Sequence, residues 1–165
     1  MTNKEKFLEA AKRRSFDELV HLLDQDDNIN AKDEYTGYNA LCLFIKNGGI
    51  KPKSDKLEEK SAVIDAVYYL MDKGLKIEQQ ATSNGTNILM EYVYVIQGAA
   101  KGYSYADDGY DLEGKGFELF KLFINKGISY TDKFGPRQIS VLDYLEDQNN
   151  TKFLDYIKEF ENHHK

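Results

Sequence analysis

The sequence contains no tryptophan, a single cysteine (Cys42) and no long apolar run. One cysteine cannot form a disulfide within the chain, so no intrachain cross-link is available to stabilise the fold. No stretch approaches the roughly 18 consecutive apolar residues of a membrane-spanning helix. The segment Met1 to Ala10 is charged and amphipathic, without the apolar core of a signal peptide. These absences predict a cytoplasmic protein that has no membrane partner.

Basic residues are in deficit, since 22 Lys and Arg stand against 28 Asp and Glu and give a formal net charge of −6. Unselective nucleic-acid binding needs a basic surface, so we expect no nucleic-acid partner. An acidic chain favours a basic partner wherever charge contributes to association.

The short motifs of common catalytic and cofactor sites are missing as well. There is no phosphate-binding glycine loop, no Gly-x-Ser-x-Gly, no His-Glu-x-x-His and no paired Cys-x-x-Cys. Cys42 lies next to Leu41 in an apolar helical stretch, which is typical of a small packed residue rather than a nucleophile. We therefore expect no catalytic residue, no cofactor and no metal site.

The chain is rich in aromatic residues, with 12 Tyr and 9 Phe among its 165 residues. Hydrophobic residues make up 41% and charged residues 30%, as in an ordinary globular protein. A chain of this length buries about 70% of its unfolded surface, enough for one domain. Some tyrosines must then lie at the surface, where they are useful in recognition.

One phrase recurs three times, over 26–41, 74–89 and 127–142, with the same distance between its first turn residue and its final leucine. Before each turn residue, apolar side chains stand at the same four offsets, three or four residues apart, and so share one face of a helix. They are Phe16, Leu19, Leu22 and Leu23; Ile64, Val67, Leu70 and Met71; and Phe117, Phe120, Phe123 and Ile124. Gly74 and Gly127 are predicted to end two of these helices in a left-handed cap.

A helix-capping residue stands two positions before each final leucine: Asn39, Asn87 and Ser140. Its side chain can accept a hydrogen bond from a free amide of the first helical turn. The sequence therefore predicts helices over about 39–46, 87–97 and 140–147, with further helices over about 3–12 and 151–161. A recurring unit of turn, helix and helix is typical of a stacked α-solenoid.

The stretch Leu22 to Asp33, followed by Gly37-Tyr38-Asn39-Ala40-Leu41, resembles the ankyrin repeat, and Gly85-Thr86-Asn87-Ile88-Leu89 is similar to the same part of it. The resemblance implies an all-α, ankyrin-like solenoid of stacked helix pairs with short turn-rich fingers. It implies a single domain over 1–165, with units of approximately 3–34, 35–82, 83–135 and 136–165. The family's histidine is replaced by Cys42, Met90 and Asp143, and the units are longer than the family's roughly 33 residues. A different helical-pair solenoid is the alternative.

The extra residues fall in two inserts between the helices of a unit, at about 47–60 and 98–115. The second insert alternates tyrosines with carboxylates, a composition suited to protein recognition. Its candidate binding residues are Tyr103, Tyr105, Asp107, Asp108, Tyr110, Asp111 and Glu113. The alternative is a solvated loop whose tyrosines fold back on the neighbouring helices. A calcium loop is disfavoured because Leu112 stands where the sharp turn requires glycine.

In the ankyrin family, partner contacts come from the turn tips and from the exposed side of the first helix of each unit. Carried over by position, the resemblance nominates Tyr35, Thr36, Tyr38, Lys46, Asn47, Ser83, Asn84, Thr86 and Tyr94. The alternative for the small polar members is that they are ordinary turn residues.

The sequence therefore predicts a non-catalytic protein-protein interaction module. A narrower hypothesis is a bacterial immunity or inhibitor protein that neutralises a basic toxin enzyme, since small acidic ankyrin-like proteins occur in that role. The alternative is an enzyme or small-ligand-binding protein with a site between the inserts, built on the carboxylates of the second insert. Self-assembly through an exposed end of the stack is a third hypothesis, and the sequence leaves the oligomeric state open.

Overall fold

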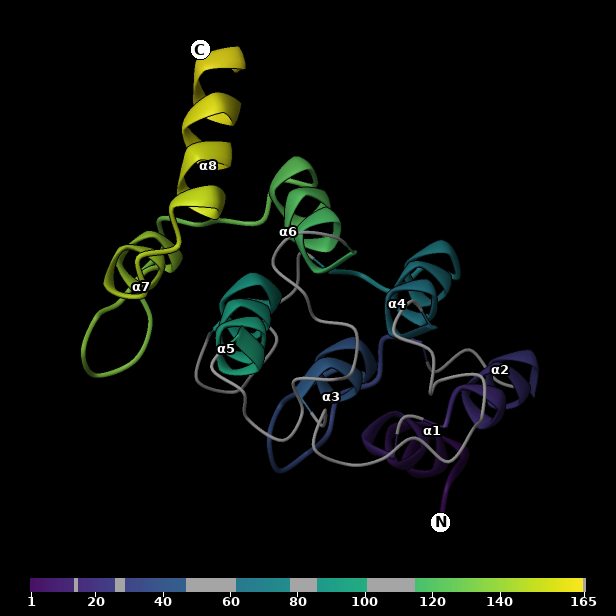
Figure 1. The fold of residues 1–165 in the computed structure, drawn as a ribbon. Coiled ribbons are helices and arrows are strands. Elements are labelled where there is room, and N and C mark those ends of the chain that lie inside the picture. Colours follow the sequence, from purple (N-terminus) through teal and green to yellow (C-terminus); the bar gives the residue numbers. More distant parts are fainter. Residues whose placement is uncertain (14, 26–28, 47–61, 78–85, 101–114, 165) are drawn as a thin grey trace.

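A computed structural model describes residues 1–13, 15–25, 29–46, 62–77, 86–100 and 115–164 (Figure 1). Within these ranges the chain forms eight α-helices and no β-strand, so the all-α class is confirmed. The helices are α1 (Asn3–Lys12), α2 (Phe16–Gln25), α3 (Ala40–Lys46), α4 (Ala62–Asp72), α5 (Ile88–Ala100), α6 (Lys115–Asn125), α7 (Val141–Asp147) and α8 (Thr151–His163). None of these helices combines the length and the apolar character needed to cross a bilayer.

The helices lie in two rows (Figure 1). In the first row α1 packs on α3, α3 on α5, and α5 on α7. In the second row α4 packs on α6 and α6 on α8, while the rings of Phe16 and Tyr69 meet edge to face at 5.3 Å and join α2 to α4. Contacts of α1 with α2, α5 with α6, and α7 with α8 hold the rows together. The two termini lie at opposite ends of the molecule.

Two helices of the second row, α4 and α6, end where glycine permits a left-handed turn. Gly74 follows α4 with a φ of +98° and Gly127 follows α6 with a φ of +83°. The amide of Leu75 donates to the Leu70 carbonyl at 3.1 Å, and the amide of Gly74 donates to the Met71 carbonyl at 3.1 Å. This pair of bonds is the Schellman motif, and it repeats after α6. The predicted glycine caps are confirmed.

Three first-row helices, α3, α5 and α7, begin at the predicted capping residues. The side chain of Asn39 accepts a hydrogen bond from the Cys42 amide at 2.9 Å, and that of Asn87 accepts one from the Met90 amide at 2.9 Å. Ser140 accepts from the amide three residues later at 3.1 Å. Because these bonds satisfy amides that a helix leaves unpaired, they fix where α3, α5 and α7 start. Two predicted ends were short: α5 continues to Ala100 and α8 to His163.

The predicted apolar stripes face the space between the rows. Leu19, Val67, Leu70, Phe120 and Phe123 are fully buried. Among the first-row helices, α3 and α5 contribute most of their own residues to the same core, including all of α3 except its last residue. Burial of side chains of this size stabilises the fold by about 1.5–3 kcal/mol each.

Side-chain amides connect turns that are far apart in sequence. Asn30 accepts a hydrogen bond from the Lys76 amide at 2.8 Å and donates one to the Gly74 carbonyl at 3.3 Å. Asn87 donates to the Ser129 carbonyl at 2.8 Å. Each amide therefore joins the turn that precedes one first-row helix to the turn that follows a second-row helix. These bonds fix how the turns lie against one another, and in each the backbone partner lies more than 40 residues away.

Candidate protein-binding surface

The structure describes only part of the predicted binding residues. Tyr35, Tyr38, Lys46, Thr86 and Tyr94 belong to the described ranges. All seven candidates of the second insert, Tyr103, Tyr105, Asp107, Asp108, Tyr110, Asp111 and Glu113, lie outside the described residues, as do Asn47, Ser83 and Asn84. The surface below is therefore built from the turn before α3 and from the first-row helices.

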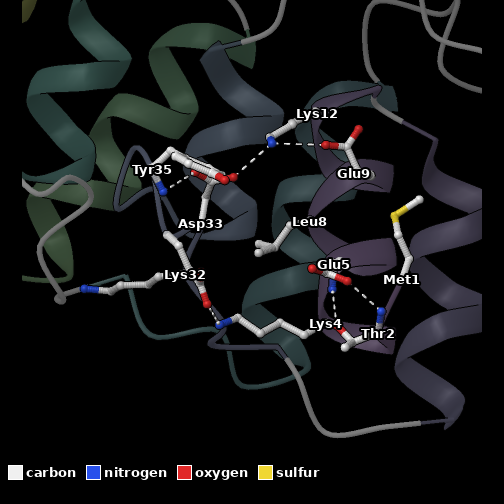
Figure 2. A pocket seen from close by; sticks show the side chains of 11 residues that line it. Met1, Thr2, Lys4, Glu5, Leu8, Glu9, Lys12, Lys32, Asp33 and Tyr35 are labelled. Carbon is white, nitrogen blue, oxygen red and sulfur yellow. Dashed lines mark hydrogen bonds and ion pairs between the residues drawn. The ribbon is translucent and has the colours of Figure 1, made fainter.

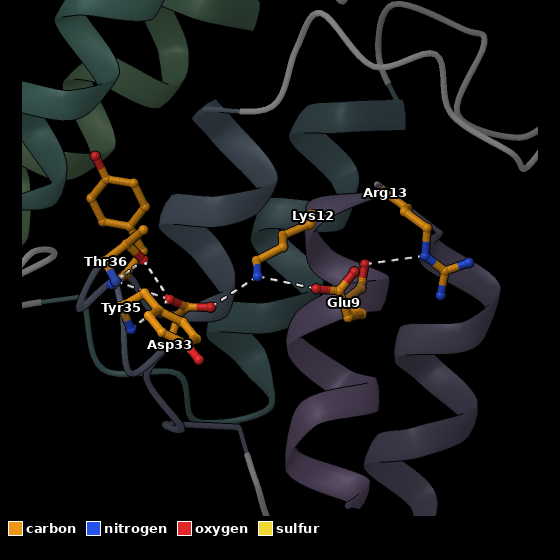
Figure 3. A network of polar contacts seen from close by, with 7 residues as sticks. Glu9, Lys12, Arg13, Asp33, Tyr35 and Thr36 are labelled. Carbon is orange, nitrogen blue, oxygen red and sulfur yellow. Dashed lines mark hydrogen bonds and ion pairs between the residues drawn. The ribbon is translucent and has the colours of Figure 1, made fainter. Parts of the chain in front are cut away.

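Asp33 shapes the turn before α3 (Figure 3). Its Oδ1 atom accepts hydrogen bonds from the amides of Tyr35 and Thr36 and from the Thr36 hydroxyl, at 2.9–3.0 Å. Its Oδ2 atom lies 2.9 Å from Nζ of Lys12, on α1. The Asp33 side chain is 8% exposed, whereas Tyr35 is 94% exposed. The buried carboxylate thus tightens a turn that displays Tyr35 to solvent.

The same contacts set the charge of Asp33. The hydrogen bond from Lys12 and those from Thr36 and Tyr35 lower the pKa of Asp33 from 3.8 to about 2, against the opposing effect of burial. Lys12 also lies 3.1 Å from Glu9 on its own helix. The Glu9–Lys12–Asp33 chain therefore attaches the turn to α1 by charge-assisted hydrogen bonds.

A shallow hollow of about 380 Å³ lies between α1 and this turn (Figure 2). Its lining combines the Leu8 side chain with Tyr35 and with charged groups of both signs. The charges compensate one another: Lys12 pairs with Asp33, and Lys4 lies 3.7 Å from Glu34. A hollow of balanced charge does not select a ligand of one sign.

An ion pair joins α3 to α5. Nζ of Lys46 lies 2.9 Å from Oε2 of Glu91 and donates a hydrogen bond to the Tyr38 hydroxyl at 2.8 Å. The hydroxyl of Thr86 donates to the other oxygen of Glu91 at 3.0 Å. The Glu91 side chain is only 6% exposed, whereas that of Lys46 is 35% exposed. The partners therefore cover the carboxylate and leave the lysine stem at the surface.

The contacts of this ion pair also shift the pKa values of Lys46 and of the nearby Cys42. Burial disfavours the Lys46 ammonium, but the hydrogen bonds with Tyr38 and Glu91 outweigh it, and the pKa of Lys46 is raised. Cys42 is fully buried, and burial together with the Glu91 carboxylate raises the pKa of its thiol, against the weaker effect of Lys46. A buried neutral thiol is a poor nucleophile. The prediction that Cys42 is a small packed residue is confirmed.

An aromatic pair joins α5 to α7. The rings of Tyr94 and Tyr144 meet edge to face, with centroids 4.6 Å apart and an interplanar angle of 75°. Tyr94 is 40% exposed and Tyr144 is half-buried. The surface formed by Tyr38, Lys46, Glu91, Tyr94 and Tyr144 is called the first-row face below. Its contacts link the turn before α3 to α3, α3 to α5, and α5 to α7.

The structure thus brings three predicted residues together, Tyr38 and Lys46 by direct contact and Tyr94 one turn beyond Glu91 on α5. Sequence reasoning missed Glu91 and Tyr144. A signal for Glu91 was present, because it is the only charged residue in the otherwise apolar segment 88–100 and such a charge needs a buried partner. Tyr144 gave no such signal, since its partner is known only once α5 and α7 are adjacent.

The first-row face offers tyrosine rings, a lysine ammonium and few flexible apolar side chains. Such a composition suits contact with a protein surface. Within the described ranges, no three His, Cys, Asp or Glu side chains are grouped so that they could hold a metal ion. Comparison with protein-family models and with curated proteins gave no match to this chain.

Proposed function

We propose that this chain is a non-catalytic protein-binding module, built as an ankyrin-like solenoid, that binds its partner through the exposed Tyr35 of the turn before α3, the first-row face and the second insert. The observation that carries the proposal is the series of contacts that links the face across α3, α5 and α7. Exposed Tyr94 and the Lys46–Tyr38 contact come from different units, yet they share one surface with Glu91 and Tyr144. Tyrosine provides rigid contact area at low entropic cost, and such residues dominate binding energy at interfaces.

The arrangement of helices supports the solenoid part of the proposal. Helices that alternate in sequence fall into two parallel rows, as expected when helix pairs stack (Figure 1). The turns before α3 and α7 each carry an isolated antiparallel bridge, Lys32 with Asn39 and Phe134 with Ile139, which suits short fingers. Asn30 and Asn87 each hydrogen-bond through the side-chain amide to the backbone of a turn that follows a second-row helix.

The non-catalytic part is supported by the structural use of the perturbed and buried groups. Asp33 holds a turn, Glu91 pairs with Lys46, and Asn39 caps a helix. Cys42 is buried among apolar side chains. A catalytic group must reach a substrate, and these side chains already have structural partners.

The test is affinity capture from the native lysate at low salt, followed by measurement of the affinity of the purified partner. We expect one stoichiometric partner whose binding weakens at least about tenfold in the Tyr35→Ala, Tyr94→Ala double variant. Tyr68→Ala is the matched control, because Tyr68 is also 40% exposed but lies on α4 in the second row. Recovery of chaperones alone, or equal loss with the control, would contradict the proposal.

In its narrower form the proposal is that the chain is a cytoplasmic inhibitor of a basic toxin enzyme. The net charge of −6 and the acidic, tyrosine-rich second insert support it. The test is to express the product of the neighbouring gene with and without this chain. We expect the product of the neighbouring gene to stop cell growth when it is expressed alone, and growth to be restored when this chain is co-expressed. A neighbouring gene whose product is harmless would contradict this form.

A further inference from the structure

The contacts between helices of the first-row face follow one pattern. Each joins a residue of one helix to a residue about one turn nearer the start of the next first-row helix. Lys46, in the last turn of α3, contacts Glu91, in the first turn of α5. Tyr94, one turn after Glu91, contacts Tyr144 on α7. Asp147, one turn after Tyr144, is the next residue in this order. It is exposed and accepts a hydrogen bond from the side chain of Gln148 at 3.1 Å, and α8 of the second row packs against α7.

The contact between α3 and α5, here called the α3–α5 seam, and the contact between α5 and α7 differ in how their charge is balanced. At the α3–α5 seam the chain supplies its own cation, because Nζ of Lys46 lies 4.9 Å from the centre of the Tyr38 ring and pairs with Glu91. Neither α5 nor α7 contains a basic residue, and α7 contains the exposed carboxylates Asp143, Glu146 and Asp147. The nearest described compensation is Lys133, 3.8 Å from Asp143, and both of these side chains are largely exposed. The α5–α7 half of the face is therefore aromatic and acidic.

We propose that Tyr94, Tyr144 and Asp147 receive an arginine side chain of the partner protein; this inference rests on the proposed function and specifies the chemistry of its surface. An aromatic ring attracts a cation placed over its face, and the attraction grows when the pair is removed from water. Exposed Tyr94 presents such a ring, held by its contact with Tyr144. Asp147 supplies the carboxylate, one helical turn after Tyr144 on α7.

Arginine fits this arrangement better than lysine. The planar guanidinium can stack on a tyrosine ring and form two parallel hydrogen bonds with a carboxylate, whereas the ammonium of lysine is compact and more strongly hydrated. The acidic net charge of the chain accelerates the approach of such a partner at low salt. The occupied α3–α5 seam repels a second cation, since Lys46 already lies there.

The test uses the full chain labelled with ¹⁵N and titrated with hexa-arginine and, separately, with hexa-lysine. We expect amide shifts centred on α5 and α7 at Tyr94, Tyr144 and Asp147, with hexa-arginine at least about fivefold tighter than hexa-lysine. Asp147→Asn and Tyr94→Ala should each weaken binding at least about threefold, and Tyr94→Phe, which keeps the ring, should retain most of it. Shifts spread over all acidic surfaces, or equal affinity for both peptides, would overturn the inference.

Two controls separate the local site from general charge attraction. Tyr68→Ala removes an equally exposed tyrosine from α4, and Asp155→Asn removes an exposed carboxylate from α8; neither should change peptide affinity. If Tyr35→Ala weakens binding of the captured partner but hexa-arginine causes no amide shift at Tyr94, the proposed arginine site is wrong and the proposed binding module is retained. If hexa-arginine binds at Tyr94 but no stoichiometric partner is captured, the site stands and the proposed function is wrong.

Discussion

At Glu91 the chain places a carboxylate within an apolar helix and supplies its partner from a neighbouring helix. The residue is covered by Lys46, Thr86 and the start of α5 itself. A buried carboxylate costs several kcal/mol unless charge and hydrogen bonds compensate it. The pair therefore adds little net stability, but loss of one member leaves the other without compensation.

Lys46→Met should accordingly lower the free energy of unfolding by about 2 kcal/mol, less than for a fully buried pair because Lys46 is a third exposed. The double variant Lys46→Met, Glu91→Leu should recover most of that loss, since it removes the buried charge as well. Urea unfolding followed by far-ultraviolet circular dichroism measures both. A double variant less stable than the single one would show that the pair itself is a net source of stability.

Asp33 gives the fold a defined dependence on acid. Its pKa is about 2 in the folded protein, against 3.8 for an unperturbed side chain. A lowered folded pKa contributes stability that is complete above the unfolded pKa and disappears as the pH falls through the folded one. We expect this contribution to be about 1 kcal/mol, because solvent screens the partly exposed Lys12, and to disappear between about pH 4 and pH 2.

The measurement is urea unfolding at several pH values for the native sequence and for Asp33→Asn, which keeps an acceptor for the turn amides. The difference in stability between the two proteins should shrink as the pH falls through this window. Thr131→Ala, at an exposed position in the turn before α7, removes no titratable group; it is the control and should show no such trend. A difference that is constant from pH 5 to pH 2 would contradict the assignment to Asp33.

At the scale of the helix, Gly127 ends α6 for reasons of backbone alone. An added Cβ would meet no heavy atom within 4 Å, so a side chain there costs only the left-handed conformation. Gly127→Ala should lower stability by about 1 kcal/mol. Gly127→Asn should cost less, since asparagine tolerates this region, as Asn149 does here with a φ of 54°. Thermal unfolding of Gly127→Ala and Gly127→Asn measures these losses of stability, with Lys126→Ala at the adjacent exposed position as the control. Equal stability of all three variants would contradict the prediction.

The helix ends were predictable because their causes are local. Asn39, Asn87 and Ser140 cap helices through amides three residues away, and Gly74 and Gly127 end helices through their own backbone. The first-row face was only half predictable, because the two pairs that join different helices, Lys46–Glu91 and Tyr94–Tyr144, connect residues more than 40 positions apart. Tyr38 and Lys46 were found from a repeat position, whereas their neighbour Glu91 depends on how closely α3 and α5 approach.

For the whole molecule, the remaining issue is how binding is divided between the first-row face and the second insert. In the proposed ankyrin-like architecture the two would lie on different parts of a unit, because the insert would connect the helices at the end away from the turns. The structure joins α5 and α6 independently of that connection, through direct packing and through the Tyr92 hydroxyl, which donates to the Gly116 carbonyl. The insert can therefore be exchanged while the helix pair is retained.

We expect replacement of residues 102–114 by a six-residue Gly/Ser linker to change the unfolding free energy by no more than about 1 kcal/mol, because a shorter loop closes at slightly lower entropic cost. If the insert carries specificity, the same protein should lose its captured partner, while hexa-arginine should still reach Tyr94 and Asp147. Urea unfolding, partner affinity and the peptide titration on one preparation test all three. Unchanged partner affinity in the folded replacement would instead assign recognition to the first-row face, and Tyr94→Ala in the replaced background should then remove it.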